Sequence, residues 1–168
     1  MSEFAVRAVS LARSQVSSQL QAGIDLALTQ LHDWIQASGD LQQLDLAFGS
    51  KWNRRLGLQL IQSWLSGQQL PEIEVVSADL INGGRGAFDR TNSKIYISQQ
   101  VLDLQSQQPS LVSAVILEEL GHYLDSQVNQ LDSAGDEGAI FAKVIRREQI
   151  SRNRPLITST IELIDLVI

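Results

Sequence analysis

The stretch "VILEELGHYLD", residues 115–125, brings several side chains that can bind a metal ion or transfer a proton close together in the sequence. Glu118 and His122 are four residues apart, so on a helix their side chains lie about one turn apart on the same face. Two ligands at this spacing can grip one metal ion, and Glu119, which follows the first of them, is then placed to polarise a metal-bound water. The spacing therefore indicates a candidate metal site with a general base beside it.

The surrounding residues fit a helix that has one apolar and one polar face. At 100° per residue, residues 111–128 place one set of apolar side chains on a single arc: Ile116, Leu117, Leu120, Leu124 and Val128. The opposite arc holds Glu118, His122, Asp125 and Asn129, with Glu119 at its edge. A second interpretation of this arc is a solvated helix face, since a Glu–His pair at this spacing contributes roughly a few tenths of a kcal/mol without any metal. Both interpretations stay open at this point.

Gly121 lies inside the same helix. Glycine costs about 1 kcal/mol relative to alanine at a helix interior. We therefore expect that the backbone of another element approaches the helix closely at Gly121.

Composition limits the classes of protein to which the chain can belong. Its 168 residues suit one domain, and 43% of them are apolar and 19% charged, as in ordinary globular proteins. The net charge of −6 argues against a nucleic-acid partner, because phosphate binding requires clustered Lys and Arg. The one basic cluster, Lys143 to Arg154, is expected to cap the end of a helix. The chain has no cysteine, which excludes disulfides, thiol catalysis and Cys-ligated zinc.

Neither end of the sequence has the features of a membrane-inserted segment. The N-terminus carries Glu3, Arg7 and Arg13 and does not resemble a Sec signal peptide, so we expect a cytoplasmic protein or export by a signal-independent route. The C-terminal run "LITSTIELIDLVI" is short and is interrupted by Glu162 and Asp165, so it is not expected to span a membrane. The oligomeric state is left open.

Periodicity and turn residues predict an α+β fold that is mainly helical, with a small β-sheet or hairpin before the helix of residues 110–128. Helices are expected over residues 4–20, 24–37, 41–48, 54–66, 110–128 and 138–147. Strands are expected over residues 73–80 and 94–98 and around residues 87–88, with turn residues at 82–84 and a loop at 89–93. Ser110 is expected to cap the central helix, and the three tryptophans and His32 are expected to be structural.

The order of these pieces resembles that of the zincin metallopeptidases. It is more closely similar to a zincin-like module of large bacterial, often cyanobacterial, proteins with hemolysin-type calcium-binding repeats. The pieces that carry the resemblance are "LPEIEVVSADL", "GAF", "KIYIS", "ILEELGHYLD" and "VNQLDSAGDEGAIFA", which together cover roughly residues 46–145. The resemblance implies one domain of residues 1–168, with N-terminal helices at 1–45, a zincin-like core at 46–150 and an apolar tail at 151–168.

The resemblance also implies a role for each residue of the site. His122 would be a metal ligand, Glu119 the general base, and Glu118 would stand where zincins have the first histidine of H-E-x-x-H, giving an EExxH motif. The third ligand would be Glu137, with Asp136 as the alternative ligand. Asp125, and Asp136 where it is not itself a ligand, would lie next to the ligands and orient them. A different interpretation of Asp136 and Glu137 is that acids in the first turn of a helix complement its dipole.

The function implied is a metal-dependent hydrolase that acts on peptide bonds. Its substrate would be a peptide or protein bound by strand addition to an edge strand at residues 94–98. Zinc is the favoured metal, but a glutamate in place of a histidine makes the site harder, so calcium and manganese are alternatives. The alternative function is a non-catalytic, zincin-derived binding or structural module, whose acidic stripe would hold calcium or simply be solvated.

Overall fold

A computed structural model of the chain describes residues 3–37, 39–129 and 135–150, with side chains from residue 18 onward. The α+β class, mainly helical with one small sheet, is confirmed. In chain order the elements are α1 (Glu3–Ala37), η1 (Leu41–Leu44), α2 (Asp45–Phe48), α3 (Arg54–Leu65), β1 (Glu72–Val76), η2 (Ala78–Ile81), β2 (Gly86–Asp89), β3 (Lys94–Ser98), α4 (Gln99–Leu102), α5 (Pro109–Val128) and α6 (Glu137–Ile145). The two η elements are 3-10 helices.

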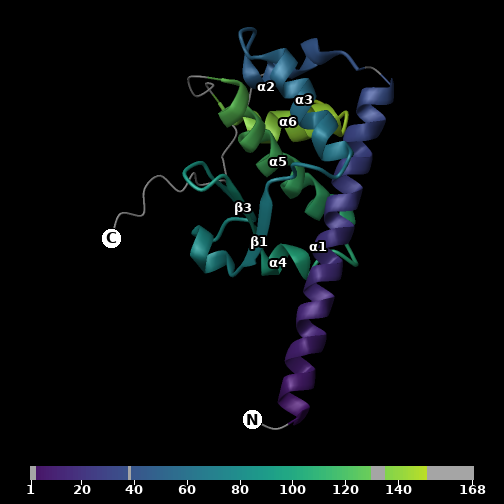
Figure 1. The fold of residues 1–168 in the computed structure, drawn as a ribbon, viewed down its shortest axis with the longest axis vertical. Coiled ribbons are helices and arrows are strands. Elements are labelled where there is room, and N and C mark those ends of the chain that lie inside the picture. Colours follow the sequence, from purple (N-terminus) through teal and green to yellow (C-terminus); the bar gives the residue numbers. More distant parts are fainter. Residues whose placement is uncertain (1–2, 38, 130–134, 151–168) are drawn as a thin grey trace.

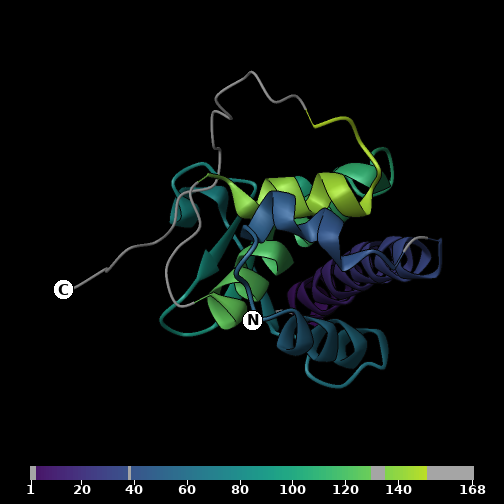
Figure 2. The ribbon, with the colours of Figure 1, turned by 90° about the horizontal axis from the view of Figure 1, so that it is seen from above.

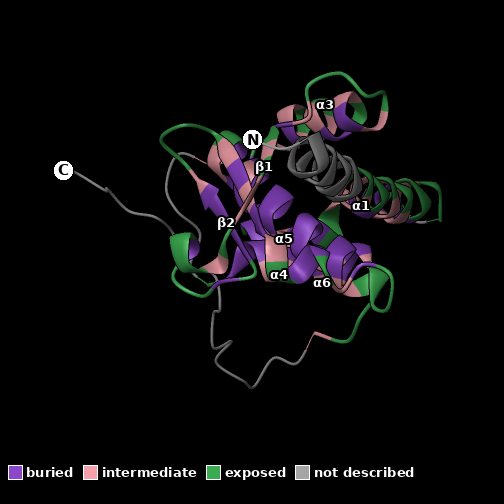
Figure 3. Cartoon of the chain, turned by 90° about the horizontal axis from the view of Figure 1, so that it is seen from below, coloured by how far each residue is buried: buried purple, intermediate pink, exposed green. Residues whose placement is uncertain are grey.

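Helix α5 is the centre of the molecule. Helices α1, α3 and α6 and the sheet all pack against it, and most of its surface is buried (Figure 3). Its N-terminus is set by Pro109, which occupies the first helical turn after Gln108, so the expected cap at Ser110 is wrong. Its apolar arc joins a core in which all three tryptophans are buried, as expected.

Helix α1 is continuous, so the prediction of two helices over residues 4–20 and 24–37 is wrong. Gly23 lies inside it, where a Cβ atom would come within 2.8 Å of Val112 Cγ1 on α5. Close packing on α5 therefore offsets the weak helix propensity of glycine at this position. Helix α1 runs along one side of the molecule, and its N-terminal turns extend beyond the other elements (Figure 1).

The sheet has the strand order β1-β3-β2, with β1 parallel and β2 antiparallel to β3. Residues 94–98 therefore form the central strand, and the expectation that they are an edge strand open to strand addition is wrong. Strand β1 also ends earlier than expected, at Val76. The Ser77 side chain then accepts a hydrogen bond from Asp79 N, which begins the 3-10 turn η2.

Helices α5 and α6 approach each other through two glycines. A Cβ atom on Gly121 would lie 2.8 Å from Gly138 Cα, and a Cβ atom on Gly138 would lie 2.5 Å from His122 Nε2. The expected close backbone approach at Gly121 is confirmed. Helix α6 also lies beside α2 (Figure 2), where the rings of Phe48 and Phe141 are 5.8 Å apart.

The C-terminal end of α5 is tied to the loop that follows α2. Asn53 N donates to Val128 O at 3.0 Å, and Asn129 Nδ2 donates to Phe48 O at 3.2 Å. Asp45 supports this loop by accepting hydrogen bonds from Trp52 Nε1 at 2.8 Å and from Arg54 Nη2. These contacts fix the end of α5 relative to α2 and α3.

The expected apolar tail at 151–168 lies outside the described residues, as do the last four residues of the expected basic cluster. Lys143 of that cluster lies in the last turn of α6, as expected for a helix C-terminus. Among the helices that the structure describes, none combines the length and the apolar character needed to cross a membrane.

We expect Gly121→Ala to lower the free energy of unfolding by about 1–3 kcal/mol, because the added methyl group meets the backbone of α6. This loss would outweigh the gain of about 1 kcal/mol in helix propensity. The matched comparison is Gly23→Ala, whose methyl group meets side-chain atoms of Val112, Ile116 and Gln105, at 2.8, 3.0 and 3.7 Å, rather than backbone, and should cost less. Chemical unfolding followed by circular dichroism measures both. A Gly121→Ala variant as stable as the parent would contradict the expectation.

Candidate metal centre

The polar face of α5 is buried. Glu119 and Asp125 are 1% exposed, His122 is 6% exposed and Glu118 is half-buried. The interpretation of this face as a solvated helix surface is therefore wrong. Burying ionisable groups is costly unless they are paired, protonated or bound to a metal, so this face needs a chemical explanation.

Helix α6 brings two acids to His122 from its N-terminal end. Asp136 is the N-cap of α6, and its Oδ1 accepts a hydrogen bond from Ala139 N at 2.9 Å. The same Oδ1 lies 3.7 Å from His122 Nε2. Glu137 Oε1 lies 3.4 Å from the other ring nitrogen, Nδ1. Asp136 and Glu137 are 7% and 4% exposed, so their role is not limited to complementing the helix dipole at the surface.

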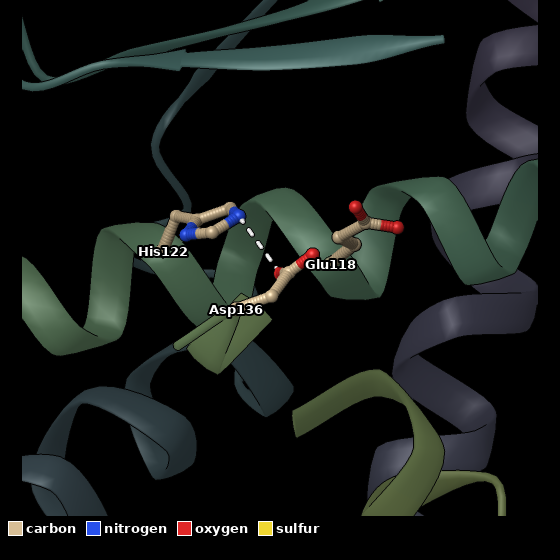
Figure 4. A group of neighbouring side chains, drawn as sticks. All are labelled: Glu118, His122 and Asp136. Carbon is tan, nitrogen blue, oxygen red and sulfur yellow. Dashed lines mark ion pairs between the residues drawn. The ribbon is translucent and has the colours of Figure 1, made fainter. Parts of the chain in front are cut away.

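Glu118, His122 and Asp136 form a group that could hold a metal ion (Figure 4). One ligand atom from each residue lies within 4.8 Å of the other two. Within the described part of the chain, the buried Nε2 of His122 has no hydrogen-bond partner. Two carboxylates and one imidazole nitrogen that converge in this way fit a divalent cation.

The two acids of α6 therefore take different positions around the imidazole. The structure places Asp136 beside Glu118 and Nε2, where the alternative ligand was expected. It places Glu137 at Nδ1, on the opposite edge of the ring, where a carboxylate orients a metal-binding histidine and raises its basicity.

Asp125 lies at the other end of the buried polar face. Its Oδ1 accepts a hydrogen bond from Asn129 Nδ2 at 2.6 Å, and the same amide nitrogen donates to Phe48 O. Asp125 therefore helps to join the end of α5 to the loop after α2. Its expected role in orienting His122 stays a prediction.

Glu119 points toward the sheet. A Cβ atom on Gly86, the first residue of β2, would lie 2.5 Å from Glu119 Oε1, so the carboxyl group occupies the space that a side chain at position 86 would fill. Among the described residues, its other oxygen, Oε2, is buried without a hydrogen-bond partner. Burial is the main cause that raises the pKa of Glu119 to about 8. The charge of His122 opposes this rise, and the charges of Glu118 and Asp136 add to it.

His122 is surrounded by negative charge. Burial alone would lower its pKa, but the hydrogen bond with Glu137 and the charges of Glu119, Glu137 and Asp136 raise the pKa of His122 to about 9. The site therefore attracts positive charge. Without a metal it holds a proton on the imidazole, and a metal ion would have to replace that proton.

Two residues of this arrangement were not singled out from the sequence. Gly86 was part of the turn-like "NGGRG", and Gly138 was only the first residue of an expected helix. Each leaves room for one site residue, Gly86 for Glu119 and Gly138 for His122. A glycine at or next to the start of an element is the sequence signal in both cases, and turn chemistry explains it equally well.

Comparison of the chain with protein-family models, with curated proteins and with solved structures gave no match.

We expect Asp136→Asn to weaken divalent-metal binding by at least about 100-fold, and Glu137→Gln to weaken it by roughly 10- to 100-fold. Asparagine also caps helices, so the first variant removes a charge and keeps the N-cap of α6. Isothermal titration with Zn²⁺ and Mn²⁺ measures the affinities, and circular dichroism checks the helices. A larger loss for Glu137→Gln than for Asp136→Asn would mean that Glu137 is the ligand.

We also expect the metal-free protein to lose stability as the pH rises from about 5 to about 9. Glu119 has its pKa raised from 4.5 to about 8 and His122 from 6.5 to about 9, so in this range the folded state holds more protons than the unfolded state. Urea unfolding in the presence of a chelator measures the trend. Glu119→Gln should make the fall shallower below pH 8, and an unchanged slope would contradict the assignment to Glu119.

Proposed function

We propose that the chain is a zincin-like, metal-dependent hydrolase that acts on peptide bonds. The observation that carries the proposal is the convergence of Glu118, His122 and Asp136, which each offer one ligand atom within 4.8 Å of the other two. His122 Nε2 lies 3.7 Å from Asp136 Oδ1 and, among the described residues, is buried without a hydrogen-bond partner. The proposal is supported by the carboxyl group of Glu119, which is adjacent to this group in the chain and electrostatically coupled to it.

In this mechanism Glu118, His122 and Asp136 would hold a divalent cation, which would supply a Lewis acid to polarise the scissile carbonyl and make water more acidic. Glu137 holds the imidazole through Nδ1 and keeps Nε2 directed at Asp136. Glu119 accepts a proton from the attacking water and then donates it to the leaving amine. Its buried position against Gly86 keeps bulk water away from that proton.

The ligands favour a harder ion than those of a site with two histidines and one glutamate. Carboxylate oxygens suit manganese and calcium, whereas the imidazole nitrogen suits zinc, so we propose zinc or manganese for the catalytic form. Two ionised carboxylates neutralise the charge of a divalent cation, which leaves less positive charge to acidify water than two neutral histidines and one carboxylate would.

The substrate would bind along β2, which is the last strand in the order β1-β3-β2 among the described residues. Strand addition supplies backbone hydrogen bonds to an extended peptide regardless of its sequence. Because Gly86 of β2 touches Glu119, a peptide on this edge would lie next to the proposed base.

A second candidate function is a non-catalytic module in which the ion stabilises the fold, and here calcium is the proposed ion. The observation in its favour is the burial of Glu119 and Asp136, which are 1% and 7% exposed and leave little room for a substrate. In this case Glu119 is only a buried, protonated carboxyl group.

We expect Glu119→Gln to reduce the rate of peptide hydrolysis by about 10²- to 10⁴-fold while metal affinity is unchanged, because glutamine keeps the shape but cannot accept the proton. Mass spectrometry of a pool of unstructured peptides, with protein loaded separately with Zn²⁺, Mn²⁺ and Ca²⁺, measures the rate. Glu148→Gln, at an exposed acid in the loop after α6, is the matched control.

Full activity in the Glu119→Gln variant would remove the proposed base. If an ion raises the melting temperature of the parent protein and no loaded form cleaves any peptide, the non-catalytic candidate is correct instead.

A further inference from the structure

The turn between η2 and β2 contains Asn82, the one asparagine of the sequence that is followed by a glycine. Asn82 and Gly83 are both exposed. Apart from its immediate chain neighbours, no atom lies within 4 Å of the point where a Cβ atom on Gly83 would stand. Among the described residues, none forms a hydrogen bond with the Asn82 side chain. The amide group of Asn82 is therefore open to reaction.

An asparagine that precedes a glycine can modify itself by deamidation. The backbone nitrogen of Gly83 bonds to Cγ of Asn82, and the side-chain nitrogen leaves as ammonia with the proton of the Gly83 N–H, which closes a succinimide ring. Water then opens the ring at one of its two carbonyls and yields aspartate or isoaspartate. One water is consumed and one ammonia is released. Glycine favours the first step, because it has no Cβ atom to hinder the approach of its nitrogen.

The folded turn keeps the two reacting atoms apart. Asn82 is the C-cap of η2 and is left-handed, with φ 53° and ψ 36°. For an L-residue this ψ places the nitrogen of Gly83 nearly trans to Cβ, whereas ring closure needs the two on the same side of the Cα–C bond. The Gly83 N–H also donates to Ala78 O at 2.8 Å. Ring closure therefore requires the turn to open first.

We propose that Asn82 is a deamidation site and that opening of this turn gates the reaction. The inference goes beyond the proposed function and does not depend on the metal centre. Isoaspartate carries an extra methylene group in the backbone, so a modified chain cannot restore the original bond between Gly83 and Ala78. The modification is thus a permanent record of local opening in the segment that leads into β2.

Gln100 of α4 helps to hold the turn closed. Its Oε1 accepts a hydrogen bond from the backbone nitrogen of Ala78, the first residue of η2, at 3.1 Å. The neighbouring Gln99 bonds to Asp103 Oδ1 at 2.9 Å, four residues along the chain. Loss of the Gln100 side chain therefore loosens the turn, whereas loss of the Gln99 side chain leaves it unchanged.

Asn92 is a reference within the same molecule. It is also exposed, in the turn between β2 and β3, but the next residue is Ser93. Its Nδ2 donates to Asp89 Oδ2 at 2.7 Å. The following side chain and this hydrogen bond both hinder ring closure, so Asn92 should react much more slowly than Asn82.

The test incubates the full 168-residue chain in mildly alkaline buffer and follows each asparagine by peptide mass spectrometry, with chromatography to separate isoaspartate from aspartate. A free peptide with the sequence of residues 78–87, ADLINGGRGA, is incubated beside it. Asn82 of the folded chain should react at least about tenfold more slowly than the peptide, and the difference should vanish in denaturing urea. Gln100→Ala should speed the reaction about two- to tenfold, and Gln99→Ala should not change it.

Asn82→Gly removes the amide and keeps a residue that tolerates a left-handed backbone, so it should abolish the isoaspartate signal. Circular dichroism checks that all variants remain folded. The inference is overturned if folded Asn82 reacts as fast as the peptide, or if Asn92 reacts as fast as Asn82. It is also overturned if the two glutamine variants behave alike, or if Asn82 stays unmodified in Gln100→Ala while the peptide is fully converted.

Discussion

The contact between Gly121 and Gly138 is the constraint on which the candidate site depends. Because neither residue has a side chain, the start of α6 can lie directly against the middle of α5. A Cβ atom on Gly138 would lie 2.5 Å from the His122 ring. This closeness is what puts Asp136 and Glu137 on two sides of one imidazole. Neither acid could reach the ring from a helix held further away by a pair of ordinary side chains.

Burial then gives the site its chemical character. The site has five ionisable residues: Glu118, Glu119, His122, Asp136 and Glu137. Four of the five are acids, and all except Glu118 are less than 10% exposed. The folded state therefore needs protons or a cation at this site to limit the free-energy cost of burying the negative charges. The raised pKa of Glu119 shows that, without a metal, this carboxyl group meets the cost by holding a proton. The repulsion among the buried carboxylates makes the site costly to fold, and the same negative charges attract a divalent ion.

The sequence predicted the features that depend on local spacing. The i, i+4 placement of Glu118 and His122 and the close approach at Gly121 follow from helix geometry alone. Burial of the polar face could not be predicted, because a solvated and a buried acidic face have the same pattern. The central position of residues 94–98 depends on pairing between strands far apart in sequence. Which of two adjacent acids faces Nε2 depends on the cap of α6.

Asp136 has a consequence for how the helix and the site depend on each other. Its Oδ1 caps α6 while it faces His122, so one carboxylate serves both the start of the helix and the imidazole. The order of α6 and the charge beside His122 are therefore coupled through a single side chain. A chain that lost this side chain would lose the helix cap and the acid at Nε2 in one step.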